Sequence, residues 1–278
     1  MIRNEKAKAG GRAEDSGGYR RNARPLPASP NSSLIYGVLP VLEALRADPR
    51  RVDRVMIAQG AKENRLSEVI DHCRANSIPF TRVAREALAK YADRGANVQG
   101  VLAFVSPAQY ADVDEILENA NNTPLIVVLD GVEDPRNFGA IIRTAECAGV
   151  DGIVIPDRRS VGLTETVAKA SAGAIEHLKV AKTQNLNRFI EGLKKRDIWV
   201  VGTSVDARMS YEEWDWTRPS ALIMGGEGRG LHRLVAENCD VLVKIPMYGK
   251  IDSLNVSVAA GVILFEARRQ RKMNEGVQ

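Results

Sequence analysis

The pattern of apolar and polar residues is regular from residue 34 onward. Apolar residues first recur at helical spacing in three segments that we expect to form helices: residues 38–46, 62–75 and 85–91. Short runs rich in Val, Ile and Phe alternate with them and predict three strands: residues 54–58, 79–83 and 100–106. This alternation predicts a small α/β unit over residues 34–107.

A second unit begins with the apolar run "LIVVLD", which is typical of a strand buried on both faces of a parallel sheet. With five similar runs it gives six expected strands: residues 125–130, 152–156, 177–181, 198–205, 221–226 and 241–246. Helical segments fill the gaps, and the last of them covers residues 255–271. We therefore predict an α/β fold, a six-stranded parallel sheet with helices on both faces.

The segments outside these two units complete the predicted domain organisation. Residues 108–123 form a short acidic amphipathic helix that ends in Asn-Asn and Pro, and we expect a linker between the small unit and a second domain at residues 124–278. Residues 1–33 carry four Gly, three Pro and few large aliphatic residues, which predicts a disordered tail. The tail holds seven Lys or Arg against three acidic residues, so it is either a solvated flexible arm or a basic arm that touches RNA.

Composition narrows the class of protein further. The chain is 44% hydrophobic and 27% charged, and no apolar run approaches the roughly 20 residues of a membrane-spanning helix. The three Cys and three His residues are scattered and form no metal-binding spacing. We expect a soluble cytoplasmic protein without a membrane segment, a disulfide or a metal. Because the tail alone accounts for the net charge of +4, a bound polyanion would use the tail or local patches of the body.

Three strand-to-helix turns carry candidate chemistry, because ligands of open parallel sheets gather at the carboxyl ends of the strands. The first turn reads "DPRNFGAIIRTAECAG", where we expect Asn137 to cap the next helix and Ile141 to face the core. Arg143 and Glu146 lie on another side of that helix. They are either functional residues or an ordinary exposed ion pair.

The second turn, "LIMGGEGRGL", has four glycines between a buried strand and a helix, so its backbone can approach a ligand closely. Its spacing is not that of a dinucleotide-binding turn and the chain has no Walker A motif, which disfavours a nucleotide-dependent oxidoreductase. Glu227 within this turn is either functional or merely exposed. The third turn places Asp252, Ser253 and Asn255 before an apolar helix, where one polar residue would suffice as a cap.

Taken together, the three segments resemble the three motifs of the SpoU (TrmH) family of RNA ribose 2′-O-methyltransferases. The matching stretches are "DPRNFGAIIRTAECAG", "MGGEGRGL" and "IPMYGKIDSLNVSVAAGVILFEARRQ", and they cover most of residues 125–271. The small unit, beginning "LIYGVLPVLEALR", resembles the ribosomal-protein-like substrate-binding domain of many members. The most similar subgroup acts on a guanosine of bacterial large-subunit (23S) rRNA. The tail lies outside the resemblance.

The resemblance implies a deep trefoil knot near the C-terminus and a homodimer formed through the knot helices. It also implies S-adenosylmethionine as the cofactor, held in the knot by four residues: Gly225, Ile245, Met247 and Leu254. The matching catalytic residues are Asn137, Arg143, Glu227, Ser253 and Asn255. Since a guanidinium is always protonated, we expect Arg143 to hold a phosphate or the developing oxyanion rather than to act as a base.

The resemblance leaves two other functions open. A tRNA could replace rRNA as the substrate, or the chain could be a non-catalytic RNA-binding or ribosome-assembly protein that kept the fold. Methyl transfer from a sulfonium needs no metal. Alignment of the reacting atoms alone can lower the activation barrier by several kcal/mol, up to about 7–11 kcal/mol.

Overall fold

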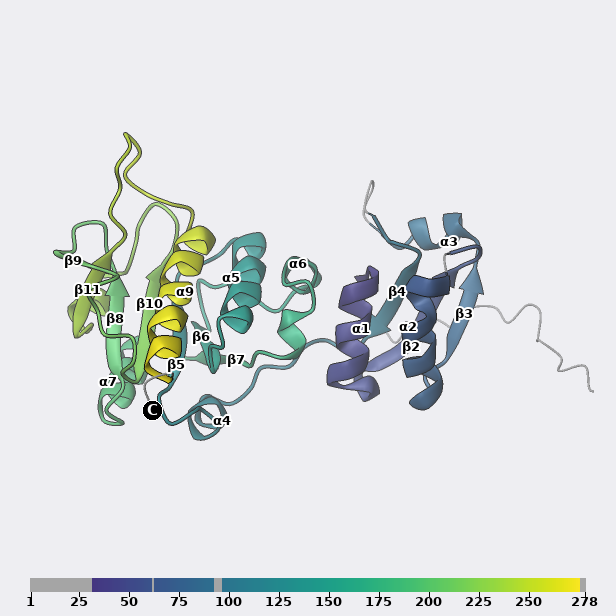
Figure 1. Cartoon of the computed structure of the whole chain (residues 1–278), viewed down its shortest axis with the longest axis horizontal. Helices are drawn as coiled ribbons and strands as arrows, with labels where there is room; N and C mark the ends of the chain where they lie inside the picture. The colour runs from purple at the N-terminus through teal and green to yellow at the C-terminus, as the bar shows by residue number, and fades with distance from the viewer. Residues whose placement is uncertain (1–31, 62, 93–96, 276–278) are drawn as a thin grey trace, which may run out of the picture.

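The computed structural model describes residues 32–61, 63–92 and 97–275. Figure 1 shows two bodies joined by an extended connection, with the short helix α4 (Val113–Glu118) between them in the sequence. Nearly all of the predicted tail lies outside the described residues. Its last residue, Ser33, already belongs to a strand, so the boundary at residue 33 was placed slightly too late.

The small body is a four-stranded sheet covered by helices on both faces. Its strands lie in the order β1-β4-β2-β3, with these bounds: β1 (Ser33–Tyr36), β2 (Val52–Ala58), β3 (Phe80–Val83) and β4 (Val101–Val105). Helices α1 (Val38–Ala47) and α2 (Glu63–Ala75) pack on one face, and Leu88 of α3 (Arg85–Ala89) packs on the other. Strand β1 was not predicted, because a four-residue strand antiparallel to β4 has too short a pattern.

The large body is built on a parallel sheet of seven strands in the order β7-β6-β5-β10-β8-β11-β9. Six are the predicted ones: β5 (Leu125–Asp130), β6 (Gly152–Pro156), β7 (Val180–Thr183), β8 (Trp199–Thr203), β10 (Ser220–Gly225) and β11 (Val241–Lys244). The expected count of six was wrong by one, because the two-residue strand β9 (Met209–Ser210) pairs with the edge of β11. Strand β7 begins three residues later than predicted, since a 3-10 turn, η2 (Ala174–Glu176), precedes it.

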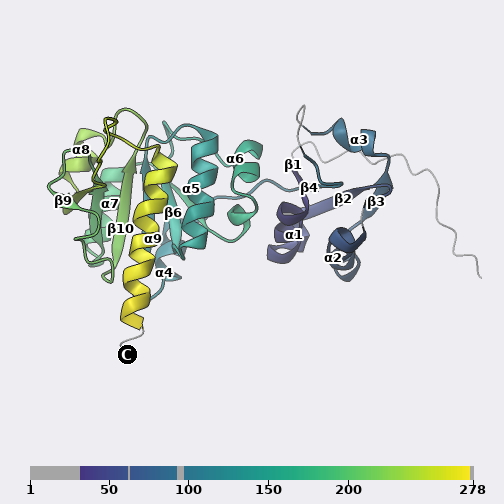
Figure 2. The same cartoon turned by 45° about the horizontal axis from the view of Figure 1, so that its top comes forward.

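Helices cover both faces of this sheet, as the buried apolar runs predicted. On one face, α5 (Pro135–Cys147) and α9 (Val256–Glu275) lie side by side in both views (Figures 1 and 2). On the other face lie α4, α7 (Leu186–Lys194) and α8 (Arg233–Glu237). The apolar positions of α7 follow helical spacing, and their side chains fill that face: Leu186, Phe189, Ile190 and Leu193. Helix α6 (Glu165–Ala170) packs closely against α5 at Gly139, a small residue of α5.

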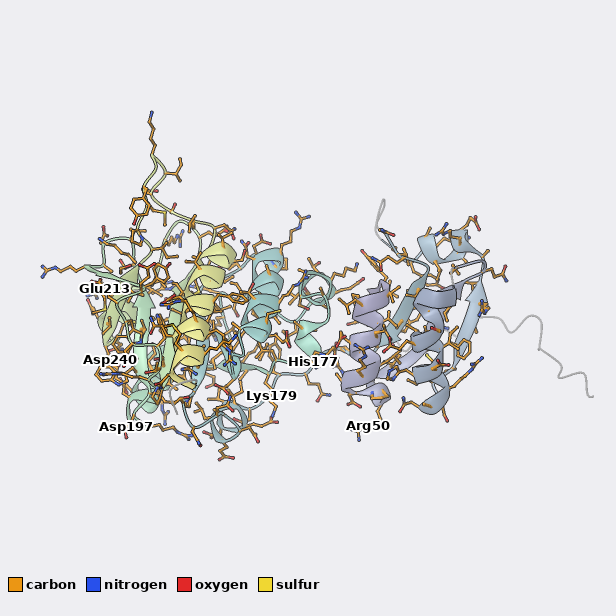
Figure 3. The ribbon with its side chains drawn as sticks, viewed as in Figure 1. Arg50, His177, Lys179, Asp197, Glu213 and Asp240 are labelled. Carbon is orange, nitrogen blue, oxygen red and sulfur yellow. The ribbon has the colours of Figure 1, made fainter. Side chains whose placement is uncertain are left out.

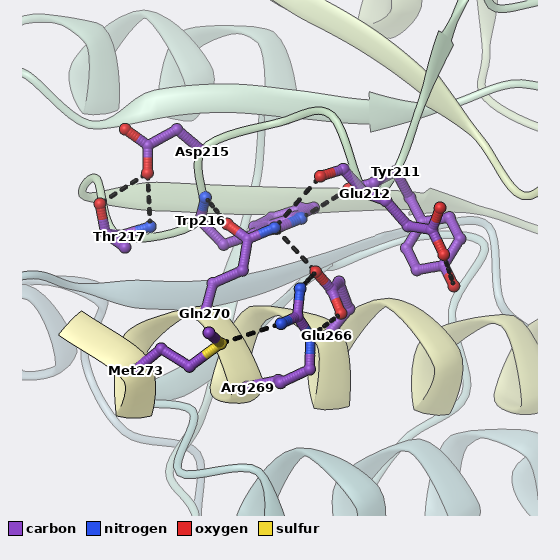
Figure 4. Close-up of polar contacts among 9 residues, drawn as sticks. All are labelled: Tyr211, Glu212, Asp215, Trp216, Thr217, Glu266, Arg269, Gln270 and Met273. Atoms are coloured by element: carbon purple, nitrogen blue, oxygen red, sulfur yellow. Dashed lines mark hydrogen bonds and ion pairs between the residues drawn. The ribbon is translucent and has the colours of Figure 1, made fainter. Parts of the chain in front are cut away.

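The second half of α9 is held by the segment before β10 (Figure 4). Trp216 is completely buried, its backbone N–H donates to Oε1 of Gln270 (2.9 Å), and its indole N–H donates to the carbonyl of Tyr211 (2.8 Å). Arg271 of α9 donates to the carbonyls of Trp216 and Pro124. Two segments far from the last helix in sequence, one before β10 and one before β5, therefore hold it in place.

The two bodies meet through ionic contacts at η2. Arg51 pairs with Glu176, whose side chain is only 6% exposed, and also donates to the carbonyl of Ser106 (2.9 Å). Burial raises the pKa of Glu176, although Arg51 opposes the shift. Beside this pair, Nε2 of His177 lies 2.7 Å from a carboxylate oxygen of Glu43, and Figure 3 shows His177 at the boundary between the bodies. The small body is thus docked on the large one at a defined place.

Candidate active site

Sheet order brings two of the three predicted turns together. Strands β5 and β10 are neighbours, with Asp130 opposite Gly225 at their carboxyl ends. The turn that follows β5 and the glycine-rich turn that follows β10 therefore lie side by side at one edge of the sheet. This crevice, where the chain order reverses, is the usual ligand site of open parallel sheets.

Hydrogen bonds join three residues, one from each predicted motif, and we call them the amide–carboxylate triad: Asn137, Glu227 and Asn255. The side-chain amide of Asn137 donates to Oε1 of Glu227 (2.6 Å), and the amide of Asn255 donates to the same oxygen (2.7 Å). The Asn255 amide also lies 3.0 Å from Oδ1 of Asn137. Residues separated by as many as 118 positions thus meet at one carboxylate, and no described residue bonds its second oxygen.

The N-cap of α5 differs from the prediction, and the N-cap of α9 belongs to the triad. Asp134 caps α5, since its carboxylate accepts from the N–H of Arg136 (2.9 Å) and Pro135 occupies the first helical position. The expected role of Asn137 as N-cap was therefore wrong, and its side chain is available for Glu227. At α9 the cap is Asn255, whose Oδ1 accepts from the N–H of Ser257 (2.9 Å). One side chain both starts the helix and completes the triad.

A cavity of about 730 Å³ opens beside the triad. All four predicted cofactor residues line it (Gly225, Ile245, Met247 and Leu254), as do Glu227, Ser253 and Asn255. Only glycine fits at position 225, because an added Cβ would lie 2.0 Å from the carbonyl carbon of Gly230. The resulting wall of exposed backbone and apolar side chains suits a flat heterocycle bound through N–H and C=O groups.

A second cavity of about 340 Å³ lies on the other side of the glycine-rich turn. It shares Asn137 and Glu227 of the triad, and further polar residues line it: Asp130, Glu133, Asp134, Arg159, Arg229 and His232. Asp130 is only 4% exposed, and its Oδ2 accepts from the backbone N–H of His232 (2.8 Å). Its other carboxylate oxygen, Oδ1, lies 2.9 Å from Nδ1 of the His232 ring. This cavity was not predicted from the sequence, although Asp130 ends a buried apolar strand, which is a recognisable signal.

Arg143 is not part of this cluster. It lies exposed on α5, forms no ion pair with Glu146 or with any other described residue, and lines neither cavity. The alternative expectation, an ordinary ion pair between Arg143 and Glu146, was therefore also wrong for the described residues. Its guanidinium faces solvent, where it can meet a bound anion.

Other catalytic chemistries find little support in the described part of the chain. It contains no group of three or more His, Cys, Asp or Glu side chains placed to hold a metal ion. Burial raises the pKa of Cys73 to about 11 and that of Cys239 to about 12, so both thiols are protonated and poor nucleophiles at neutral pH. Across the same residues, none of the helices has the length and hydropathy to cross a bilayer.

Comparison with known proteins agrees with this geometry. Residues 124–265 match the SpoU rRNA Methylase family, and residues 34–111 match a family described as RNA 2′-O ribose methyltransferase substrate binding. The chain belongs to the SpoU rRNA methylase family. Its two matched segments contain all the site residues described above.

Individual relatives span nearly the whole chain. YacO of Bacillus subtilis, named provisionally as a TrmH family tRNA/rRNA methyltransferase, is 44% identical over 85% of this chain and 95% of its own length. The 23S rRNA (guanosine-2′-O-)-methyltransferase RlmB of Pseudomonas putida is 43% identical over 86% of this chain and 97% of its own. Among solved structures, an AdoMet-bound rRNA methyltransferase from Sinorhizobium meliloti has a TM-score of 0.69 and 28% identity, covering 86% of this chain and 87% of that one.

Proposed function

We propose that this chain transfers the methyl group of S-adenosylmethionine to the 2′-hydroxyl of a guanosine in 23S rRNA. The observation that carries the proposal is the amide–carboxylate triad, which joins all three motifs at the mouth of the 730 Å³ cavity. An RNA 2′-O-ribose methyltransferase needs a pocket for the donor beside polar groups that orient a sugar hydroxyl, and the site offers both.

S-adenosylmethionine is the cofactor, and the larger cavity fits it. Gly225 gives close access to the backbone of the glycine-rich turn, and Ile245, Met247 and Leu254 supply apolar contacts. The volume lies within the ~300–1,000 Å³ usual for small-molecule sites. When bound, this cofactor supplies an electrophilic methyl group on a sulfonium.

The triad orients the hydroxyl that receives the methyl group. Two amides hold Oε1 of Glu227, so the unbonded second oxygen can accept a hydrogen bond from the ribose 2′-hydroxyl and increase its nucleophilicity. Ser253 lines the same cavity and supplies a further hydroxyl at its edge. Arg143, exposed nearby on α5, binds a phosphate of the RNA, for which its planar guanidinium is suited.

We also propose the trefoil knot and the homodimer. In support of the knot, β11 lies sixth in the spatial order of the sheet, whereas α9 returns to pack on α5, and its Arg271 donates to the carbonyls of Trp216 and Pro124. In support of the dimer, large apolar side chains are exposed on α9 and the loop before it: Tyr248 (96%), Ile251 (74%), Val258 (52%) and Phe265 (51%). A second copy of the chain would cover this surface.

The proposed division of labour follows the two bodies. Residues 34–107 bind the RNA, residues 108–123 link, and residues 124–278 carry out the transfer; the two family matches support these boundaries. The basic tail at residues 1–33 adds electrostatic affinity for RNA. A tRNA is the second candidate substrate, favoured by the name of the Bacillus subtilis relative, which covers both RNAs.

The proposal is tested by mapping 2′-O-methyl groups in total RNA from cells with and without this chain, and by adding the purified chain and S-adenosylmethionine to unmodified 23S rRNA. We expect one 2′-O-methylguanosine of 23S rRNA to disappear in the cells and to return in the test tube. A lost site in tRNA would favour the second candidate, and an unchanged map would refute both.

A further inference from the structure

The smaller cavity is not explained by cofactor binding, since it lies across the glycine-rich turn from the cofactor cavity. Two members of the triad, Asn137 and Glu227, form part of its wall, so a molecule in this cavity touches the groups that orient the ribose hydroxyl. This inference rests on the proposed function: a nucleotide whose ribose lies at the triad has its base or its phosphate in the 340 Å³ cavity.

Glu133 differs from the other carboxylates that line this cavity. Asp130 accepts from His232, Asp134 caps α5, and Glu227 accepts from two amides. Glu133 has no hydrogen-bond or ion-pair partner among the described residues, and both of its oxygens are therefore available to a ligand.

The backbone on each side of Glu133 is fixed. The preceding residue, Val132, is buried, and its carbonyl accepts from the N–H of Val161 (3.3 Å). The following residue, Asp134, is held by its capping bond to Arg136 (2.9 Å). The carboxylate of Glu133 is thus presented at the cavity from a braced turn, which lowers the entropy lost on binding.

We propose that Glu133 selects guanine as the target base by accepting hydrogen bonds from its N1–H and N2–H groups. The Watson–Crick edge of guanine carries two adjacent donors, which match the two acceptor oxygens of one carboxylate. The edges of adenine, cytosine and uracil each place an acceptor beside a single donor, and a carboxylate repels that acceptor. RNA bases that are splayed out of a helix are commonly read on this edge.

Two arginines make the acidic cavity compatible with RNA. Arg159 and Arg229 both line it and have no ion-pair partner among the described residues, so their charges are available for the phosphates that flank the target nucleotide. Arg159 holds a φ of 56°, an uncommon backbone conformation for a non-glycine residue that is often found at functional sites. The cavity therefore offers cations for the phosphate and one unpaired carboxylate for the base.

The test compares guanosine with inosine, which lacks only the 2-amino group. The wild-type chain first methylates unmodified 23S rRNA, and the modified nucleotide is mapped. A short RNA hairpin is then made around that position with either guanosine or inosine, and kcat/KM is measured for each. Losing one hydrogen bond to a carboxylate should lower kcat/KM for inosine about tenfold or more.

The variant Glu133→Gln should lose this discrimination, because its amide offers one acceptor instead of two. We expect the ratio of guanosine to inosine to fall to about one, mainly through a lower kcat/KM for guanosine, with S-adenosylmethionine binding unchanged by calorimetry. The matched control is Glu191→Gln, which removes the same charge from an exposed position on α7 across the sheet and should keep the wild-type ratio.

Each remaining outcome counts against the inference. An unchanged ratio in Glu133→Gln, a wild-type ratio near one, or a mapped target other than guanosine would overturn it while leaving methyl transfer established. If Glu133 had only a structural role, Glu133→Gln would lower kcat/KM equally for the guanosine and inosine RNAs, and the ratio would stay unchanged. Failure of the wild-type chain to methylate any RNA would instead refute the proposed function, and with it the role of Glu133.

Discussion

Replacement of Asn255 separates the two tasks of this side chain, which caps α9 and bonds to Glu227 and Asn137. Asn255→Ala removes both tasks. Asn255→Ser keeps the cap, because serine is an equally good N-cap residue, but it has no amide to donate to Glu227. Asn185→Ala is the matched control, since Asn185 caps α7 through the N–H of Arg188 (3.1 Å) and lies on the other face of the sheet.

The structure sets the expected magnitudes. Loss of a cap alone costs about 1 kcal/mol, which is the expected effect of the control. Loss of the amide donor at Glu227 costs about 1.5 kcal/mol, the lower end for a bond to a charged group, because Glu227 is exposed to solvent. Asn255→Ala should therefore lower the free energy of unfolding by about 2.5 kcal/mol, and Asn255→Ser by about 1.5 kcal/mol.

Urea unfolding followed by tryptophan fluorescence measures these differences in one domain. All three tryptophans of the chain lie at positions 199, 214 and 216, so the signal reports the large body only. Methyl transfer to 23S rRNA is measured on the same samples. Both Asn255 variants should lose about 100-fold or more in kcat, the size of effect usual for a group that assists proton transfer, whereas Asn185→Ala should keep the wild-type rate.

Two results would refute this reasoning. If Asn255→Ser kept the wild-type kcat, the bond to Glu227 would have no role in orienting the hydroxyl. If Asn255→Ala were no less stable than Asn185→Ala, the contacts that join the three motifs would contribute nothing beyond an ordinary cap.

Three further predictions concern the remaining parts of the molecule. Arg51→Ala leaves the buried Glu176 unpaired and should lower the free energy of unfolding by about 3 kcal/mol at pH 7. Burial raises the pKa of Glu176, so this loss of stability should shrink as the pH falls through that pKa and the carboxyl becomes protonated. Arg50→Ala, at an exposed position, is the control in the same unfolding assay. Gly225→Ala should abolish S-adenosylmethionine binding by calorimetry, because the added Cβ collides with backbone; measurable binding would contradict the proposed cavity. Arg143→Ala should abolish methylation but leave cofactor binding nearly intact, and more than about a tenth of the wild-type rate would speak against its role.

The sequence was sufficient to predict the parts of the fold that depend on burial. Six strands of the large sheet were predicted from short runs rich in apolar residues, and the structure has all six. Ile141 faces the core as its spacing predicted. The polar residues singled out in the three turns, except Arg143 and Glu146, gather at one place, because parallel strands bring their carboxyl ends to the same edge of the sheet.

Features that depend on tertiary contacts were not predictable in the same way. Strand β9 is two residues long and exists only through pairing with β11, so no local pattern marks it. Asp134 and Asn137 are both good cap residues, so the local sequence does not distinguish between them. In the structure Asp134 is the cap, because the side chain of Asn137 bonds to a residue 90 positions away. The smaller cavity could not be predicted without the strand order, because β5 and β10, whose following turns line it, are far apart in sequence.

The central claim is that the cofactor binds among the three joined motifs, with its methyl group at the amide–carboxylate triad. A crystal structure of the full chain with S-adenosylmethionine tests it most directly. We predict that the methyl carbon lies at the mouth of the cavity lined by Gly225 and Leu254, within contact of Asn255, and that the C-terminal helix passes through a closed loop of the chain. A cofactor bound outside this cavity, or a helix that is not threaded, would contradict the account.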